Sequence, residues 1–420
     1  MGVENQVNLF TTIFLIGLGA SIIVQWLLVQ RHVTHIRANR EQVPEAFSDK
    51  IPVEAHHKAA DYTQTKVKTG LAELIIGSVF LLCWTLAGGL QLLDNGWRSF
   101  GLSEILTGTG FILSVFAIIT ILDLPMSIYR TFKLEQSFGF NKMTAKIFVI
   151  DLIKNAIIGL LIGTPLLLFI LWIMENSGTY WWGYVWLIWL SFSLFMMWAY
   201  PAFIAPLFNK FRPLENTELK IRIENLLSRN GFKSQGIFVM DGSTRSAHGN
   251  AYFTGLGANK RIVFFDTLID ELSYDEIEAV LAHELGHFKC NHIKKRITVL
   301  GSVFLIGLAI LGWLIHEPWF YNGLGVAQAS NYIALVLFII VSPVFTFFLQ
   351  PLFSFISRKH EFEADDFAAD QELTENLITA LISLYRENAN TLTPDPLYSA
   401  FHDSHPPAPI RIAHLRSKFA

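Results

Sequence analysis

The stretch of the sequence best suited to chemistry is 282-AHELGHFKCNH-292, in which two histidines flank a glutamate. His283 and His287 are four residues apart, so on a helix their side chains project from one face, one turn apart. Two imidazoles in that arrangement can bind one Zn²⁺ ion. Glu284 follows the first histidine and can take a proton from the attacking water and pass it to a leaving amine. The spacing therefore predicts metal-dependent peptide hydrolysis.

A catalytic zinc needs a third protein ligand, and the segment 358-RKHEFEADDFAAD-370 offers carboxylates for it. Glu361 and Asp365 are four residues apart on a predicted helix, whereas Glu363 points away from their shared face. Glu361 could bind the zinc while Asp365 orients one of the histidines. The alternative is a solvated acidic helix next to the membrane. The two histidines favour the ligand interpretation, and we expect one Zn²⁺ per chain.

Two other stretches are candidates for substrate contacts. In 245-RSAHGNAYFTG-255, the run Ala251–Thr254 is predicted to form an edge strand to which a peptide substrate could add, with Asn250 as a side-chain contact. In 402-HDSHPPAPIR-411, His405 or Arg411 could stabilise the oxyanion of the tetrahedral intermediate. The alternatives are an ordinary loop and strand in the first stretch, and a proline-rich turn before a terminal helix in the second.

Two residues directly after the HELGH motif could also lie near a metal. Cys290 is expected to be a packing residue, and His292 is expected to pack or to lie behind the metal ligands. The chain has only one other cysteine, Cys83, and the two form no CxxC pattern. Both are predicted to be free thiols, so the chain needs no oxidising compartment.

The composition places these motifs in a membrane protein. The chain has 420 residues, of which 52% are hydrophobic and 16% charged, whereas about a quarter of the residues of a soluble protein are charged. Its mean hydropathy is +0.40. The net charge of −3 argues against a nucleic-acid-binding surface.

Seven apolar runs are long enough to be membrane spans. Three ionisable residues, Asp123, Asp151 and Lys154, lie at the edges of the third and fourth runs, either at interfacial depth or lining a water-filled cavity. The seven runs are Leu9–Val29, Leu71–Leu93, Ile105–Ile121, Phe148–Met174, Trp181–Ala205, Ile297–Ile315 and Tyr332–Ile356.

The loop charges predict how the spans are oriented. The segments after the first, third, fifth and seventh runs are rich in Lys and Arg. The N-terminal segment and the segments after the second, fourth and sixth runs contain no Lys or Arg except Arg98. The positive-inside rule places the basic side in the cytoplasm, so the N-terminus lies outside and the C-terminus inside. The predicted parts are 1–207 with spans one to five, a cytoplasmic insertion at 208–296 with HELGH, 297–357 with spans six and seven, and a cytoplasmic tail at 358–420 with Glu361 and the SHPP segment.

The insertion is predicted to be a small α+β metallopeptidase domain. A helix is expected at Glu218–Arg229, followed by three short β-rich runs. A capping box from Ser273 to Glu276 then starts the helix that carries HELGH. The β-rich runs are Gly236–Met240, Ala251–Thr254 and Ile262–Phe265.

Four motifs, RSAHGNAYFTG, HELGHFKCNH, RKHEFEADDFA and SHPPAPIR, together resemble those of the type I CAAX prenyl proteases, a family of integral-membrane zinc metallopeptidases of the gluzincin kind. The resemblance covers most of the chain. It implies a mainly helical fold of seven membrane helices in a barrel around a water-filled chamber, with the zinc site closing the cytoplasmic end. It also implies residue roles: zinc ligands His283, His287 and Glu361, catalytic base Glu284, and substrate or oxyanion contacts Asn250, Ala251, His405 and Arg411.

The resemblance further implies the activity. Members of the family cleave the C-terminal tripeptide from farnesylated CaaX proteins, so the expected partners are a peptide or protein substrate with or without a prenyl group, and membrane lipid. The expected location is the ER membrane or a bacterial inner membrane, with the active site on the cytoplasmic side. One alternative is a quality-control metalloprotease that acts on non-prenylated substrates. Another is a non-enzymatic seven-span transporter or receptor, against which the sequence shows no inverted repeat.

Overall fold

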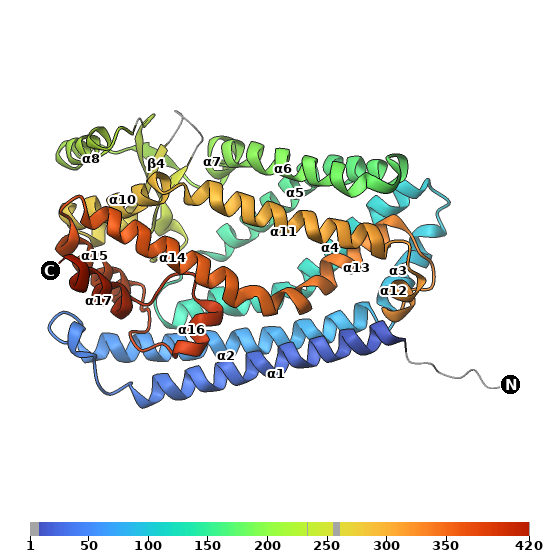
Figure 1. Ribbon diagram of the computed structural model, residues 1–420, viewed down its shortest axis with the longest axis horizontal. Coiled ribbons are helices and arrows are strands. Elements are labelled where there is room, and N and C mark those ends of the chain that lie inside the picture. Colours follow the sequence, from blue (N-terminus) through green and yellow to red (C-terminus); the bar gives the residue numbers. More distant parts are fainter. Residues whose placement is uncertain (1–7, 233, 255–260, 420) are drawn as a thin grey trace.

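The computed structural model describes residues 8–232, 234–254 and 261–419, and over these residues the chain is mainly helical (Figure 1). Seven helical segments there are long and apolar enough to cross a membrane, which confirms the predicted number of spans. They are α1 (Leu9–Ala38), α2 (Val53–Trp84), α4 (Glu104–Tyr129) continued by the π-helix Arg130–Glu135, α5 (Ala145–Asn176), α6 (Trp181–Ala199) continued to α7 (Ala205–Phe208), α11 (His292–Leu314), and α13 (Asn331–Thr346) continued to α14 (Gln350–Ala369).

The predicted bounds of the second span, Leu71–Leu93, are wrong. The helix ends at Trp84, and a separate helix, α3 (Gly89–Arg98), follows a turn. Gly88 in that turn has a φ of 80°, a left-handed conformation that glycine adopts far more easily than other residues. The apolar run continues through the turn, so hydropathy alone did not reveal the break. At its other end α2 begins at Val53, well before the apolar run starts.

The first two helices are longer than a bilayer requires. α1 and α2 have 30 and 32 residues, which at about 1.5 Å per residue exceeds the roughly 30 Å hydrocarbon core. Their extensions reach the C-terminal part of the chain, which lies at the same end of the molecule (Figure 1). Arg31 of α1 binds Asp395 at 2.9 Å, and Asp395 caps the short helix α16 (Pro396–His402). The extensions therefore hold the tail in place.

Contacts between the spans form a closed arrangement. α4 contacts α5, α5 contacts α6, α6 contacts α11, α11 contacts α13, and α13 returns to α4. α1 packs on α13, and α2 packs on α1. The core between these helices is built from large apolar side chains such as Phe14, Phe111 and Tyr332. Two ionisable residues of span four contact the segments that follow α6, since Asp151 binds Arg245 at 2.8 Å and Lys154 donates to the carbonyl of Leu207.

A small sheet follows span five. Its strands are β1 (Phe211–Pro213), β2 (Ile237–Met240), β3 (Ala251–Thr254) and β4 (Arg261–Phe265), in the order β1-β2-β4-β3. The three predicted β-rich runs are confirmed as β2, β3 and β4, whereas β1 was missed because it has only three residues. β3 lies at the edge of the sheet and pairs with β4 in the antiparallel sense.

The helix that carries the HELGH motif is α10 (Tyr274–Lys289), and its predicted capping box from Ser273 to Glu276 is confirmed. Ile277, Leu281 and Leu285 are at most 1% exposed and belong to a core shared with the sheet. Burial of each such side chain stabilises the fold by about 1.5–3 kcal/mol. Helices α8 (Thr217–Arg229), α15 (Thr374–Glu387) and α17 (Ala408–Phe419) complete this core.

Gly286, the glycine of HELGH, allows α10 and α14 to approach closely. A Cβ atom placed there would lie 2.8 Å from the Cα atom and 3.0 Å from the carbonyl oxygen of Ala364 in α14. Both are backbone atoms, so no side chain can turn away to relieve the clash. The absence of a side chain at Gly286 thus sets the distance between the two helices.

We expect Gly286→Ala to separate α10 from α14. Overpacking costs about 1–3 kcal/mol, so the melting temperature should fall and metal-dependent peptide cleavage should be lost. Gly301→Ala is the matched control, because the nearest atom to an added Cβ there is a Trp189 side-chain carbon at 3.9 Å. Thermal melting and cleavage assays on both variants test this; equal behaviour of the two would contradict it.

Candidate metal centre

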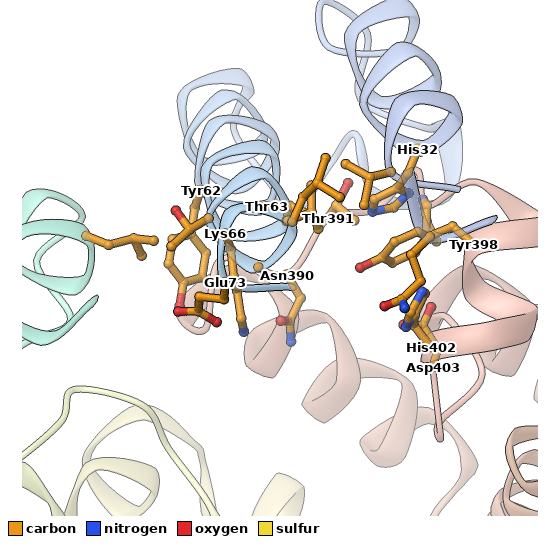
Figure 2. Close-up of a pocket in the computed structure, with 18 of the residues that line it drawn as sticks. His32, Tyr62, Thr63, Lys66, Glu73, Asn390, Thr391, Tyr398, His402 and Asp403 are labelled. Carbon is orange, nitrogen blue, oxygen red and sulfur yellow. The ribbon is translucent and has the colours of Figure 1, made fainter. Parts of the chain in front are cut away.

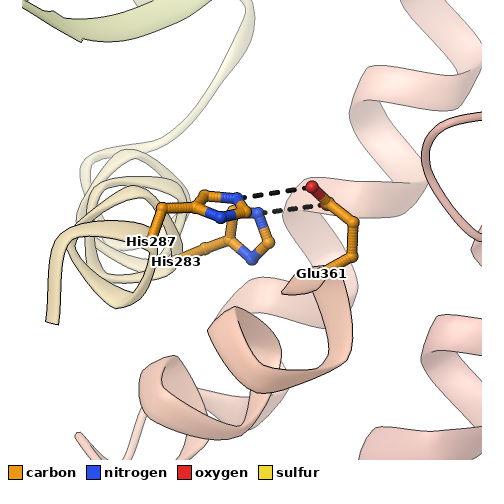
Figure 3. A group of neighbouring side chains, drawn as sticks. All are labelled: His283, His287 and Glu361. Carbon is orange, nitrogen blue, oxygen red and sulfur yellow. Dashed lines mark ion pairs between the residues drawn. The ribbon is translucent and has the colours of Figure 1, made fainter. Parts of the chain in front are cut away.

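Three predicted metal ligands converge between α10 and α14. His283 and His287 project from one face of α10 toward Glu361 of α14 (Figure 3). The Nε2 atom of His283 lies 3.4 Å from Oε2 of Glu361, and Nε2 of His287 lies 3.3 Å from Oε1. Glu361 reaches this position because α14 continues span seven beyond the apolar segment.

The three side chains fit a divalent metal ion. Their donor atoms all lie within 4.8 Å of one another. Glu361 is 3% exposed, and its Oε2 atom is buried with no hydrogen-bond partner among the described residues. A buried carboxylate oxygen without a hydrogen bond is costly, and the nearby guanidinium of Arg411 lies 3.7 Å away, beyond hydrogen-bond distance, so the oxygen is still available to a metal ion. Two imidazole nitrogens and one carboxylate are a donor set found in catalytic zinc sites, which leave a further coordination position open.

Asp365 lies one turn beyond Glu361 and contacts His283 from behind. Its Oδ1 atom is 2.8 Å from Nδ1 of His283, and the residue is fully buried. A carboxylate in this position fixes the tautomer of the imidazole, so that Nε2 is free to bind a metal. The position matches the orienting role expected of Asp365.

We expect Asp365→Asn to weaken metal binding by about 10–100-fold, the usual effect of losing such a partner of a metal-bound histidine. Asp366→Asn is the control, since Asp366 instead binds His414 at 2.7 Å, away from the ligands. Titration of both metal-free variants with zinc measures the effect. Unchanged affinity in Asp365→Asn, with an intact melting curve, would contradict the orienting role.

Arg411 is held behind the three predicted metal ligands. Its guanidinium binds Asp365 with Nε at 2.8 Å, and its Nη1 atom lies 3.7 Å from Oε2 of Glu361. Burial lowers the pKa of Arg411, but the charge of Asp365, its hydrogen bonds to the guanidinium and the charge of Glu361 together outweigh burial and raise the pKa. The arginine is therefore a permanent cation beside the site. Contact between Arg411 and the oxyanion remains a prediction. The contact that the structure shows is the one with Asp365.

His405 approaches Glu361 from the tail. Its Nε2 atom lies 3.4 Å from Oε1 of Glu361, and its Nδ1 atom lies 3.0 Å from Oγ of Ser404. Its side chain keeps 65% of its surface accessible, so it can contact a ligand from the open side of the site.

Glu284 follows His283 on α10, before His287, and is half-buried. It forms no hydrogen bond or ion pair with another residue in the described part of the chain. Its carboxylate is therefore free to exchange a proton with a substrate or a water molecule. This freedom suits a general base better than a structural residue, which would have a fixed partner.

The predicted substrate-binding strand lies at the sheet edge. Ala251 of β3 pairs with Phe264 of β4. The other side of β3 has no neighbouring strand among the described residues. The Asn250 side chain accepts a hydrogen bond from the backbone N–H of Ala251, so it is directed at its own strand. The loop before it is fixed by hydrogen bonds to residues 140–142, including Ala247 N–H to Phe140 O. Gly255, the end of this motif, lies outside the described residues.

A pocket of about 660 Å³ opens beside His405. Figure 2 shows Tyr62, Lys66 and Glu73 of α2 lining it, with Asn390 and His402 from the C-terminal part of the chain. None of these five residues was predicted from the sequence to belong to a site. A signal was present, because several of the polar lining residues of α2 recur at intervals of three or four and so share one helix face. Tyr62, Lys66, Thr69 and Glu73 are examples.

Comparisons with known proteins identify the family of the chain. Residues 32–210 match the family model "CAAX prenyl protease N-terminal, five membrane helices", and residues 213–418 match peptidase family M48. CAAX prenyl protease 1 of Saccharomyces cerevisiae is 35% identical over 90% of this chain and 89% of its own length. A CAAX prenyl protease 1 homolog of Arabidopsis thaliana is 40% identical over 73% of this chain and 72% of its own. The crystal structure of S. mikatae Ste24p superposes with a TM-score of 0.90 at 33% identity, covering 97% of this chain and 99% of that one.

Proposed function

The chain belongs to the CAAX prenyl proteases of peptidase family M48, a family of multi-pass membrane metalloproteases whose chamber fold it shares, and from this premise we propose that it is a zinc endopeptidase that removes the C-terminal tripeptide of prenylated CaaX proteins. The observation that carries the proposal is the convergence of His283, His287 and Glu361 next to the pocket that His405 lines. One zinc ion per chain would be held by these three side chains.

The residues around the ligands have separable roles in the proposed reaction. A zinc ion bound there would supply Lewis-acid chemistry, which polarises the scissile carbonyl and makes water more acidic. Glu284 takes the proton from the attacking water and delivers it to the leaving amine. His405, on the open side, stabilises the negative charge that develops on the carbonyl oxygen, and the permanent charge of Arg411 behind the ligands adds to this stabilisation. Asp365 keeps Nε2 of His283 available by accepting the hydrogen on Nδ1.

Substrate binding in this proposal uses the sheet edge and the pocket. The peptide adds alongside β3 at Ala251, and Asn250 contacts it near the start of the strand. Pairing of this kind recognises the extended backbone, so specificity for the C-terminal residues falls to the pocket. The pocket offers both charged and aromatic side chains, such as Lys66, Glu73 and Tyr62.

In the proposed orientation, the end of the molecule that carries the metal centre lies in the cytoplasm. The membrane is that of the ER or a bacterial inner membrane. The support for this orientation is the positive-inside rule, applied to loops rich in Lys and Arg. The parts of the chain proposed on this basis are spans one to five at 1–207, the metallopeptidase insertion at 208–296, spans six and seven at 297–357, and the tail at 358–420. The substrate would therefore be presented from the cytoplasm.

The test is a cleavage assay with purified protein in detergent on a farnesylated CaaX peptide. The same peptide without the farnesyl group and an unfolded, unmodified protein are the comparison substrates. We expect release of the C-terminal tripeptide, inhibition by a zinc chelator, and recovery on adding zinc. Cleavage of the unfolded protein in preference to the farnesylated peptide would instead support a quality-control protease. Absence of chelator-sensitive cleavage of any of them would overturn both.

A further inference from the structure

His292 is a buried histidine that lies directly behind the metal ligand His287. The two Nδ1 atoms are 2.8 Å apart, and the rings meet edge to face with centroids 5.1 Å apart. The Nε2 atom of His292 is 2.9 Å from Oε2 of Glu363, and His292 is only 5% exposed. Both nitrogens of His292 are thus engaged, one by a metal ligand and one by a carboxylate.

The ring hydrogens of His287 and His292 can take only one arrangement when a metal is bound to His287. Nε2 of His287 faces Glu361 and must keep its lone pair for the metal, so the hydrogen of His287 is on Nδ1. Nδ1 of His292 then accepts that hydrogen, and the hydrogen of His292 is on Nε2. A carboxylate accepts but does not donate, so Glu363 selects this tautomer of His292.

From this geometry we propose that His292 is a positioning residue that orients His287 for metal binding, with Glu363 holding His292 in the required tautomer. The proposal rests on the proposed metalloprotease function. The two histidine ligands are then oriented differently, because His283 is held directly by the carboxylate of Asp365 whereas His287 is held through a neutral imidazole. Carboxylates, carbonyls and water are the usual partners of a metal-bound histidine.

The backbone is shaped to bring His292 back to His287. α10 ends at Lys289, and Asn291 has a φ of 56°, the left-handed conformation that asparagine tolerates better than most residues. This residue interrupts the helix, and α11 begins directly after it with His292. A continuous helix would place residues five apart on different faces, so without the turn the two imidazoles could not meet.

The partners of His292 on the far side are also ordered. The ring of His360 stacks on that of His292, with centroids 4.1 Å apart and planes within 15°. Lys295 binds Glu363 at 3.2 Å, which fixes the carboxylate. His360 forms no hydrogen bond with a described residue, so it contributes packing without belonging to the chain of hydrogen bonds. It therefore provides a control that separates the two effects.

A second metal site is the competing explanation for the same side chains. Donor atoms of Cys290, His292 and Glu363 lie within 4.8 Å of one another. A metal there would need a nitrogen of His292 that is already used, so it would break the contact either with His287 or with Glu363. The orienting role keeps both contacts. The two explanations differ in metal stoichiometry.

The test measures zinc affinity directly, by titrating metal-free protein against a competing chelator of known affinity. We expect His292→Ala to bind zinc about 10–100-fold more weakly than the wild type. His292→Asn should recover part of the loss, because its side-chain oxygen can accept from Nδ1 of His287. Glu363→Gln should stay near the wild type, since its amide oxygen still accepts from Nε2, whereas Glu363→Ala should weaken binding. His360→Ala should leave the affinity unchanged.

Two results would overturn the proposal. One is wild-type zinc affinity in both His292→Ala and Glu363→Ala. The other is two zinc ions per wild-type chain, with loss of one in Cys290→Ser. If His292→Ala does not fold, as judged by thermal melting of the metal-free protein, the Glu363 variants decide the question. Failure of the proposed function would look different, because the wild type itself would then bind no zinc or cleave no peptide.

Discussion

Replacing Glu284 by glutamine is expected to abolish peptide cleavage while leaving the metal bound. Glutamine keeps the shape of the side chain but cannot take a proton from the attacking water. Loss of a general base lowers the rate by about 10²–10⁴-fold. The metal should remain, because the ligand atoms belong to His283, His287 and Glu361. Turnover of the farnesylated peptide and the zinc content of the purified variant measure the two halves of this prediction.

The control for this variant is Glu278→Gln, on the same helix. Glu278 binds Arg229 at 3.2 Å and does not face the ligands, so its variant should cleave at the wild-type rate. Substantial activity in Glu284→Gln would assign the base to another group. Loss of zinc from Glu284→Gln would show instead that Glu284 helps to hold the metal.

The second large effect is expected from Glu361→Gln, which should lose both metal and activity. The substitution removes the only negative charge among the three proposed ligands and leaves a neutral amide facing two imidazoles. An amide oxygen is a much weaker ligand for zinc than a carboxylate, and three protein ligands are the usual minimum of a catalytic site. We expect zinc content well below one ion per chain and no cleavage at ordinary zinc concentrations.

Asp370→Asn is the matched control for Glu361→Gln. Asp370 caps the end of the same helix and is exposed, so its variant should keep zinc and activity. Full zinc content in Glu361→Gln would remove Glu361 from the ligand set. Comparison with Glu284→Gln is informative, because both are inactive by prediction but only Glu361→Gln should be metal-free.

Local periodicity explains why several features of the site could be predicted. His283 and His287 share a helix face whatever the rest of the fold does, and so do Glu361 and Asp365. The capping box at Ser273 is equally local. The number of spans can also be predicted from the sequence, because an apolar run long enough to cross a bilayer seldom has another role in a protein. All of these predictions depend on residues that are close together in the sequence, within a few positions for the motifs and within about 20 for a span.

Features that depend on a change of chain direction were less predictable. The second span was expected to continue to Leu93, but the turn at Gly88 ends it at Trp84, because the turn is as apolar as the helix before it. β1 escaped notice because three residues show too little alternation. The pocket residues of α2 face the tail, which follows them by more than three hundred positions in the sequence.

The order of residues alone predicts the groups available for chemistry: two histidines and a glutamate on one helix, two carboxylates on another, seven spans and an edge strand. Only the tertiary structure decided how the remaining polar groups are shared among them. In that structure Arg411 binds Asp365, His405 lies next to Glu361, and His292 contacts His287. Helical spacing acts over one or two turns, whereas these partners meet through the close packing of α10 on α14 that Gly286 permits and through the helix break at Asn291.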